Sequence, residues 1–137
     1  MVDGSGGMKS LLDKLGYRYG TAALSWHVPE TFAQAFSALT HGVEPSFRIA
    51  FVRNASELAE AAAEVASTYR RGGHLWLAYP KKSGAIRSDL TRDHGWEPIA
   101  ALGLLAVTQV ALDEDWSALR FRYRDEIKLL KRRSEQG

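Results

Sequence analysis

A capped helical segment between two short apolar stretches constrains the fold of this chain most strongly. Phe47–Val52 and His74–Tyr79 are mainly apolar, as is typical of strands that are buried on both faces of a sheet. Asn54, followed by Glu57, is the capping-box arrangement that opens a helix, and the glycines after Arg71 end it. The apolar residues of this helix recur at helical spacing: Leu58, Ala62, Val65 and Tyr69. We therefore expect a right-handed β-α-β unit with parallel strands.

The remaining segments complete a single α/β domain. We expect further helices at 9–16, 30–39, 96–103 and 125–133, and further strands at 21–28, 104–112 and 116–124. In the last strand Leu119, Phe121 and Tyr123 alternate with arginines, which predicts one buried face and one cationic face. The short turn before Trp116 makes the last two strands an antiparallel hairpin. The predicted fold class is a mainly parallel sheet between helices on both faces, with this hairpin at its C-terminal end.

The composition is that of one ordinary globular domain. The chain has 137 residues, of which 45% are hydrophobic and 25% are charged, which is enough to build one core. It has no cysteine, which excludes disulfides, thiolate zinc sites and a cysteine nucleophile. No apolar run reaches the roughly 18 residues of a membrane span, so we expect a cytoplasmic protein without a membrane partner. Residues 1–7 are interpreted as a flexible leader or a cloning remnant, and 8–137 as the domain.

The segment Tyr79–Asp93 is the strongest candidate for a working surface. It follows a predicted strand at the carboxyl edge of the sheet, where ligands of open α/β sheets usually bind. The predicted ligand-binding residues are Lys81, Lys82, Ser83, Arg87, Asp89, Thr91, Arg92, Asp93 and Trp96. Their cations and hydroxyl groups favour an anion such as phosphate, and Gly84 permits close approach of the backbone to a ligand. The alternative is an ordinary exposed loop in which Asp89 or Asp93 caps a helix.

The C-terminal end of the chain is strongly basic. Residues 120–133 contain seven Lys or Arg against two acidic residues, an excess of five, although the net charge of the whole chain is only +2. Such a cluster favours contact with nucleic acid or another polyanion. The residues that would make this contact are Arg120, Arg122, Arg124, Lys131 and Arg132. The alternative is a solvated strand face followed by a charged helix end.

The sequence contains no complete catalytic constellation. Asp93 and His94 are adjacent, and adjacent side chains rarely point the way that an acid–base pair requires. The other histidines are isolated and lack the spacing of a helical metal pair, so we expect no metal site. Trp76 and Trp116 are expected in the core. Trp26 and Trp96 are expected near the ligand cleft, where an aromatic ring can stack on a ligand.

Four sequence blocks carry a resemblance to known proteins. They are Leu-Gly-Tyr-Arg-Tyr-Gly at 15–20, Leu-Trp-Leu-Ala-Tyr-Pro-Lys-Lys-Ser-Gly at 75–84, Asp-Leu-Thr-Arg-Asp at 89–93 and Trp-Ser-Ala-Leu-Arg-Phe at 116–121. In this order they resemble a bacterial family of small domains of unknown function, which implies a fold and no particular activity. More distantly, the order of elements resembles a truncated class I methyltransferase-type fold, which implies a single Rossmann-like three-layer domain.

The chain departs from the methyltransferase pattern at the cofactor turn. The first strand runs into Trp26-His-Val-Pro where those enzymes have a glycine-rich turn, and Arg53 stands where they have an acid. Side chains would crowd the usual cofactor position, so we expect no cofactor there, neither S-adenosylmethionine nor a dinucleotide.

The leading hypothesis is a non-enzymatic or accessory binding domain with a degenerate methyltransferase-like fold, which recognises a partner protein or an anionic small molecule. Two alternatives stay open. One is a nucleotide- or S-adenosylmethionine-related enzyme with an unconventional site, and the other is a nucleic-acid-binding protein that uses the basic C-terminal end. A homodimer through the edge of the hairpin is also open, because unpaired strand edges invite pairing.

Overall fold

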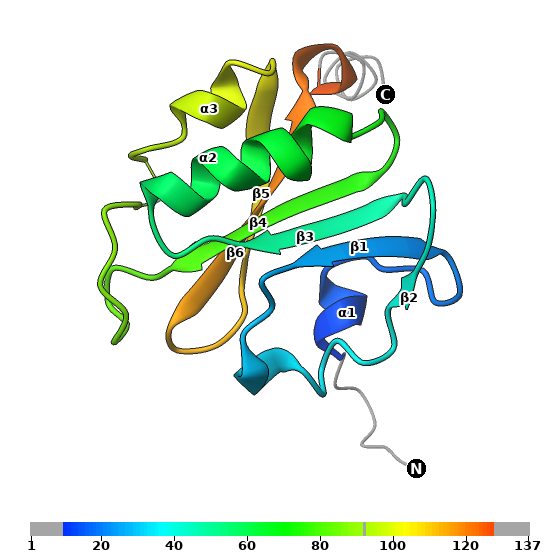
Figure 1. The fold of residues 1–137 in the computed structure, drawn as a ribbon, viewed down its shortest axis with the longest axis horizontal. Coiled ribbons are helices and arrows are strands. Elements are labelled where there is room, and N and C mark those ends of the chain that lie inside the picture. The colour runs from blue at the N-terminus through cyan, green and yellow to red at the C-terminus, as the bar shows by residue number, and fades with distance from the viewer. Residues whose placement is uncertain (1–9, 92, 128–137) are drawn as a thin grey trace, which may run out of the picture.

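A six-stranded mixed sheet forms the centre of the molecule (Figure 1). The computed structural model describes residues 10–91 and 93–127. In chain order the elements are α1 (Leu11–Lys14), β1 (Ala22–Trp26), the 3-10 helix η1 (Glu30–Phe32), β2 (Thr40–His41), β3 (Phe47–Phe51), α2 (Ala55–Glu64), the 3-10 helix η2 (Ala66–Thr68), β4 (His74–Pro80), α3 (Glu97–Ala100), β5 (Leu104–Ala111) and β6 (Trp116–Tyr123). A helical turn follows at 124–127. The rest of the helix predicted at 125–133, and the leader predicted at 1–7, lie outside the described residues.

The strands are arranged in the order β2-β1-β3-β4-β6-β5. β1 pairs in parallel with β2 and with β3, and β3 pairs in parallel with β4 after the crossover through α2. β6 runs antiparallel to both of its neighbours, β4 and β5, so β5 points the same way as β4. The predicted β-α-β unit, the mainly parallel sheet and the C-terminal hairpin are therefore confirmed.

Each face of the sheet has its own apolar core. α2 and α3 cover one face (Figure 1), where Leu58 and Ile99 are fully buried. α1 and the segment 30–39 cover the other face, where Trp76 and Trp116 are 2% and 3% exposed, as expected of core residues. Within the described ranges, no helix has both the length and the apolar character that a membrane crossing requires.

Polar groups hold both ends of α2. The amide oxygen of Asn54 accepts a hydrogen bond from the N–H of Glu57 (2.8 Å), which confirms the predicted N-cap. The Glu57 carboxylate accepts from the N–H of Arg53 (2.8 Å), one residue before the cap. Beyond the last turn, the buried guanidinium of Arg48 donates to the carbonyl of Val65 (3.1 Å). A cation there offsets the partial negative charge at the carboxyl end of the helix.

The helix predicted at 30–39 is wrong. The structure has the short 3-10 helix η1 and then turns, in which most of the backbone hydrogen bonds reach three residues back. Phe32 and Phe36 are nevertheless buried, with ring centroids 5.3 and 5.7 Å from that of Phe51. The apolar spacing therefore reflects packing on the sheet and not a regular helix. The chain then enters β2 at Thr40, a strand that the sequence did not indicate.

Candidate functional site

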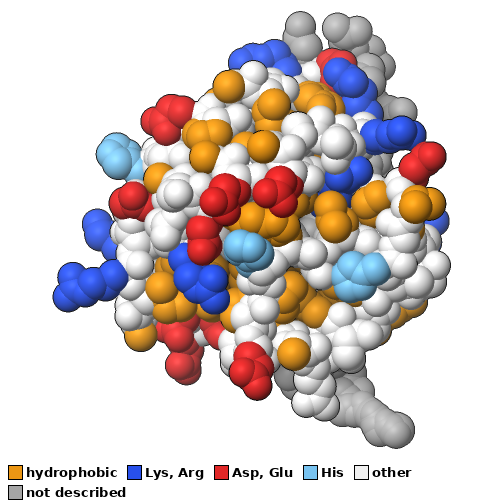
Figure 2. Space-filling model, viewed as in Figure 1, with side chains coloured by type: hydrophobic (Ala, Val, Ile, Leu, Met, Phe, Trp, Pro, Cys, Tyr) orange, Lys and Arg blue, Asp and Glu red, His pale blue; other side chains and the backbone are white. Residues whose placement is uncertain are grey.

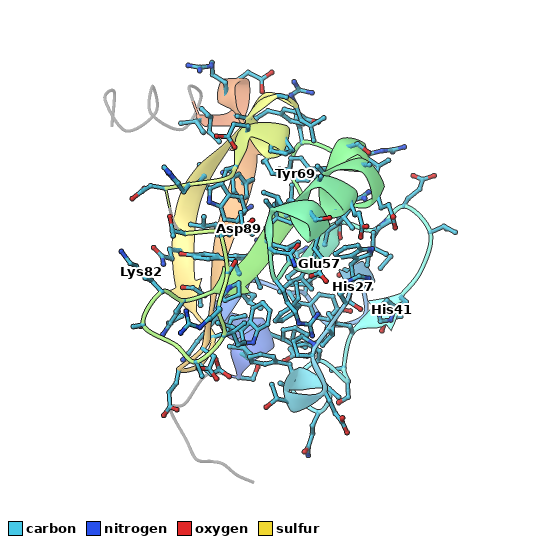
Figure 3. The ribbon with its side chains drawn as sticks, turned by 60° about the vertical axis from the view of Figure 1, so that its left-hand side comes forward. His27, His41, Glu57, Tyr69, Lys82 and Asp89 are labelled. Carbon is cyan, nitrogen blue, oxygen red and sulfur yellow. The ribbon has the colours of Figure 1, made fainter. Side chains whose placement is uncertain are left out.

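The loop between β4 and α3 is fixed to the turn of the β5–β6 hairpin. It leaves the carboxyl end of β4, as predicted, and Lys82 lies on its outer side (Figure 3). The N–H of Lys81 donates to the carbonyl of Asp115 (2.8 Å), and the N–H of Ala85 donates to the Asp115 carboxylate (2.9 Å). A Cβ added to Gly84 would come within 2.8 Å of the Asp115 Cα. The close approach expected between Gly84 and a ligand is therefore made to the hairpin turn.

Two hollows share the first residues of this loop. The larger has a volume of about 480 Å³, and its wall includes Lys81, Lys82, Ser83, Thr91 and Asp93. The smaller has a volume of about 410 Å³, and its wall includes Lys81, Lys82, Arg87, Ser88 and Thr91. The structure thus brings together most of the predicted ligand-binding residues, and two lysines face both spaces.

The basic side chains of the loop are not neutralised by the part of the chain that the structure describes. Lys82 and Arg87 are exposed and Lys81 is half-buried. Among the described residues, none of these three side chains forms an ion pair or a hydrogen bond. Asp93 supplies a carboxylate to the wall of the larger hollow. Arg92, also predicted as a ligand-binding residue, lies outside the described residues.

Asp89 has a structural partner. Its carboxylate accepts a hydrogen bond from the N–H of Ala55 (2.8 Å), the first residue of α2, and Figure 3 shows it on the side of the loop that faces this helix. Main-chain bonds of 3.3 Å between Thr91 and His94 close the end of the loop. The alternative expectation that Asp89 caps a helix is confirmed, so its carboxylate is already engaged within the protein.

Trp96 packs at the end of the loop. Its indole N–H donates to the carbonyl of Thr91 (2.7 Å). Its ring centroid lies 5.5 Å from those of Tyr79 and of Phe121. These contacts attach the loop to the sheet, and stacking of Trp96 on a ligand stays a prediction.

The carboxyl end of β1 is filled by bulky side chains. Trp26 and His27 stack with their ring centroids 3.5 Å apart and their planes at 6°. The Trp26 indole N–H donates to the carboxylate of Glu64 on α2 (3.1 Å). His27 has a φ of 56°, a conformation that glycine adopts more readily. Histidine and acidic side chains gather on this face (Figure 2), but no three of them in the described ranges are close enough to hold a metal ion.

The arginines of β6 do not form an open cationic face. Arg120 donates to the carbonyl of Gly73 (3.0 Å), and Arg122 pairs with Glu126 (3.5 Å). Both side chains are partly buried because they connect the start of β4 and the turn after β6, so the predicted solvated strand face is wrong at these two positions. Of the other residues predicted to bind nucleic acid, Arg124 is exposed, and Lys131 and Arg132 lie outside the described residues. Nucleic-acid binding stays a prediction.

The sequence did not predict a cationic group at the opposite, amino end of the sheet. His74, the first residue of β4, is partly buried, and this burial with the charges of Arg120, Arg122 and Arg18 lowers its pKa to about 4. These residues are far apart in the sequence: β6 lies beside β4 and brings Arg120 and Arg122 to His74, and Arg18 reaches it from the segment between α1 and β1. The only local signal was the Gly-Gly pair immediately before His74.

Comparison with known proteins gives similarity in structure but not in sequence. No protein-family model matches the chain, and no curated protein matches it. A protein in the NADB-Rossmann superfamily from Streptococcus agalactiae has a TM-score of 0.47 at 11% identity, over 85% of this chain and 68% of that one. LepI in complex with SAM has a TM-score of 0.44 at 14% identity, over 83% of this chain and only 39% of LepI.

The strand order itself defines the fold class. β6 runs antiparallel to both of its neighbours at one end of a mainly parallel sheet, and helices cover both faces. The chain therefore has the predicted Rossmann-like α/β fold, and a closer relation to methyltransferases stays a prediction. Membership of the bacterial family suggested by the four sequence blocks stays a prediction.

Proposed function

We propose that this protein is a binding domain for a small anionic metabolite, held by the loop 81–94 beside the carboxyl end of β4. The observation that supports this most directly is that Lys81 and Lys82 line two hollows without an ion-pair partner among the described residues. Ammonium groups that are not neutralised attract phosphate or carboxylate groups, and a concave surface strengthens the attraction.

The remaining groups of the larger hollow narrow the chemical class of the ligand. Asp93 contributes a carboxylate and Thr91 lies on the same wall. A carboxylate repels a bare anion but accepts hydrogen bonds from hydroxyl or amino groups. A phosphorylated or carboxylated metabolite that also carries such donors therefore fits this wall better than a simple inorganic anion.

The proposal is a binding role because the loop offers charges and no paired catalytic groups. His94, the candidate base, is placed by main-chain bonds to Thr91, and its ring makes no hydrogen bond to Asp93 within the described residues. At the carboxyl end of β1, the stacked Trp26 and His27 stand where a cofactor turn would need glycine. Recognition of a partner protein, an unconventional enzyme site and homodimer formation stay predictions.

Ligand binding at the loop is tested by thermal shift and calorimetry with nucleotides, S-adenosylmethionine and phosphorylated or carboxylated metabolites. A ligand that binds the folded state raises the melting temperature, and above Kd this increase grows with the logarithm of the ligand concentration. We expect Lys81→Ala and Lys82→Ala each to weaken binding about tenfold, the effect of one lost charge-assisted hydrogen bond. Lys14→Ala, on the exposed side of α1, is the matched control and should bind as the unaltered protein does. Equal affinities for all four proteins, or no stabilisation by any compound, would contradict the proposal.

A further inference from the structure

A further hollow, separate from the two beside the loop 81–94, lies at the end of the sheet where β3 and β4 begin. It has a volume of about 220 Å³. Its wall consists of Arg18 after α1, Ser46 and Phe47 at the start of β3, and Gly72, Gly73 and His74 at the start of β4, with Gly16 and Thr21 beside them. This end of the sheet is opposite to the loop 81–94, which follows the carboxyl end of β4.

Positive charge is concentrated around this hollow. The guanidinium of Arg18 is exposed and has no ion pair among the described residues. Arg120 reaches the rim, where it donates to the carbonyl of Gly73 (3.0 Å). The Nε atoms of Arg120 and Arg122 are buried and have no hydrogen-bond partner in the described part of the chain. Unsatisfied buried donors are costly, and an acceptor nearby offsets that cost.

None of the described residues that line the hollow is acidic. Glu126 is bonded to one of the lining residues: it accepts from the N–H of Gly72 (2.9 Å). It also accepts from the Tyr69 hydroxyl (3.1 Å) and pairs with Arg122 (3.5 Å). Glu126 forms an ion pair with Arg122 and its charge also acts on Arg120, whereas Arg18 has no ion pair in the described ranges.

The shape of the hollow depends on glycine. A Cβ on Gly16 would come within 2.6 Å of the His74 Nε2, and a Cβ on Gly73 would come within 2.7 Å of the carbonyl oxygen of Ser46. Gly72 has nothing within 4 Å of its Cβ position, so the space over it is open. Small residues at these positions keep the His74 ring close to the backbone and leave room beside it.

We propose that this hollow is a binding site for a compact phosphate-type oxyanion, formed by Arg18, Ser46 and His74 and independent of the loop 81–94. A guanidinium, a hydroxyl and an imidazole N–H are the donors that tetrahedral oxyanions take. The volume is larger than one phosphate group needs, so part of a small metabolite also fits, and Phe47 supplies an apolar wall. A free inorganic ion and the phosphate group of a small metabolite share this chemistry.

Binding at this site is coupled to the protonation of His74. Without a ligand, its partial burial and the charges of Arg120, Arg122 and Arg18 keep the imidazole neutral near pH 7. An oxyanion offsets those charges and accepts a hydrogen bond from the protonated ring, so it raises the pKa of His74. By linkage, the affinity for the anion increases as the pH falls from the pKa of the bound state towards the pKa of about 4 in the free protein.

The test is an NMR titration of the full-length protein with inorganic phosphate and with sulfate. Sulfate is the probe for pH dependence because its own charge stays constant. We expect chemical-shift changes at Ser46, Gly72, Gly73 and His74, and a His74 ring pKa raised by about one unit or more under saturating sulfate. Arg18→Gln should weaken binding about tenfold. His74→Gln should remove the pH dependence of sulfate affinity.

Two control variants separate this site from others. Arg53→Gln changes an exposed arginine at the start of α2, and Lys81→Ala changes the loop of the proposed function; both should bind phosphate at the amino end as the unaltered protein does. Well-dispersed spectra verify that each variant folds. The proposal is overturned if neither anion shifts Gly72, Gly73 and His74. It is also overturned if Arg53→Gln weakens binding as much as Arg18→Gln does, or if sulfate affinity does not change with pH.

Discussion

Gly84 lets the loop 81–94 pack closely on the β5–β6 hairpin because no side chain fits at its position. A Cβ there would lie 2.8 Å from the Asp115 Cα and 2.9 Å from one of its carboxylate oxygens. We expect Gly84→Ala to lower the free energy of unfolding by about 1–3 kcal/mol, the usual cost of overpacking. Urea unfolding measures this change. Gly42→Ala is the control, because its Cβ would meet only the Ala22 Cβ at 3.4 Å, and a loss there as large as at Gly84 would contradict the argument.

Single residues show why the sequence indicated a polar loop after β4 but not the contacts within that loop. The glycine in Lys-Ser-Gly84 indicated a close approach, but the sequence could not show that the neighbour is Asp115 and not a ligand. The alternation along β6 correctly placed Leu119 and Phe121 in the core, yet it predicted solvent on the other face. There Arg120 meets the carbonyl of Gly73, a contact between strands that local periodicity does not encode.

At the scale of elements, α2 is capped twice at its amino end. Asn54 accepts from the N–H of Glu57, and Asp89 reaches from the loop after β4 to the N–H of Ala55, both at 2.8 Å. The first N–H groups of a helix have no acceptor within the helix, so each capping side chain supplies the hydrogen bond that the N–H group would otherwise make to water or lack. Asp89→Ala should lower the free energy of unfolding by about 1 kcal/mol in chemical denaturation.

The control for this prediction is Glu60→Ala, an exposed residue of α2 beyond the first turn, which should change stability by less than about 0.5 kcal/mol. Because Asp89 also links the loop to α2, its removal should reduce protection of the loop amides in hydrogen exchange. If Asp89→Ala is as stable as the unaltered protein, the hydrogen bond to Ala55 contributes nothing to the fold.

Elements that are defined by their own sequence were predicted well. β3, α2 and β4 follow from apolar runs, a side-chain cap and glycines, and all lie within a few residues of their expected bounds. The segment 30–39 was predicted wrongly, because Phe32 and Phe36 have helical spacing in the sequence, but their burial comes from packing on the ring of Phe51 in the sheet. Strand β2 has only two residues and exists through its pairing with β1, so no local pattern could indicate it.

At the scale of the whole molecule, cationic groups lie at both ends of the sheet, although the net charge is only +2. Lys81 and Lys82 follow the carboxyl end of β4, and Arg18 lies beside His74 at its amino end. The two groups share no residue and belong to different hollows. Effects on stability should therefore add when Lys81→Ala and Arg18→Gln are combined, within about 0.5 kcal/mol in urea unfolding. A larger deviation would show that the two ends of the sheet are coupled.

The amino end of the sheet should also govern how the stability of the molecule responds to acid. The pKa of His74 is about 4 in the folded protein and 6.5 in its ordinary state, with burial as the largest cause. Between these pH values, His74 binds a proton in the unfolded chain but not in the folded protein. The free energy of unfolding therefore falls as the pH decreases from 6.5 to about 4. After allowance for solvent screening, this loss amounts to about 1–2 kcal/mol.

His74→Gln isolates this contribution because all carboxylates are common to both proteins. One of these carboxylates is Glu126. Burial by itself would raise the pKa of Glu126, but the pKa lies below its ordinary value because the carboxylate accepts hydrogen bonds from the N–H groups of Gly72 and Tyr123 and from the Tyr69 hydroxyl, and lies near the charge of Arg122. Its stabilising effect is lost only as the pH falls below that ordinary value. Urea unfolding at a series of pH values should therefore give a steeper decline for the unaltered protein than for His74→Gln between pH 6.5 and about 4. Sulfate should reduce this difference between the two proteins, because it raises the pKa of His74 in the folded state. If, without sulfate, the free energy of unfolding declines equally with pH in both proteins, the protonation of His74 does not affect stability.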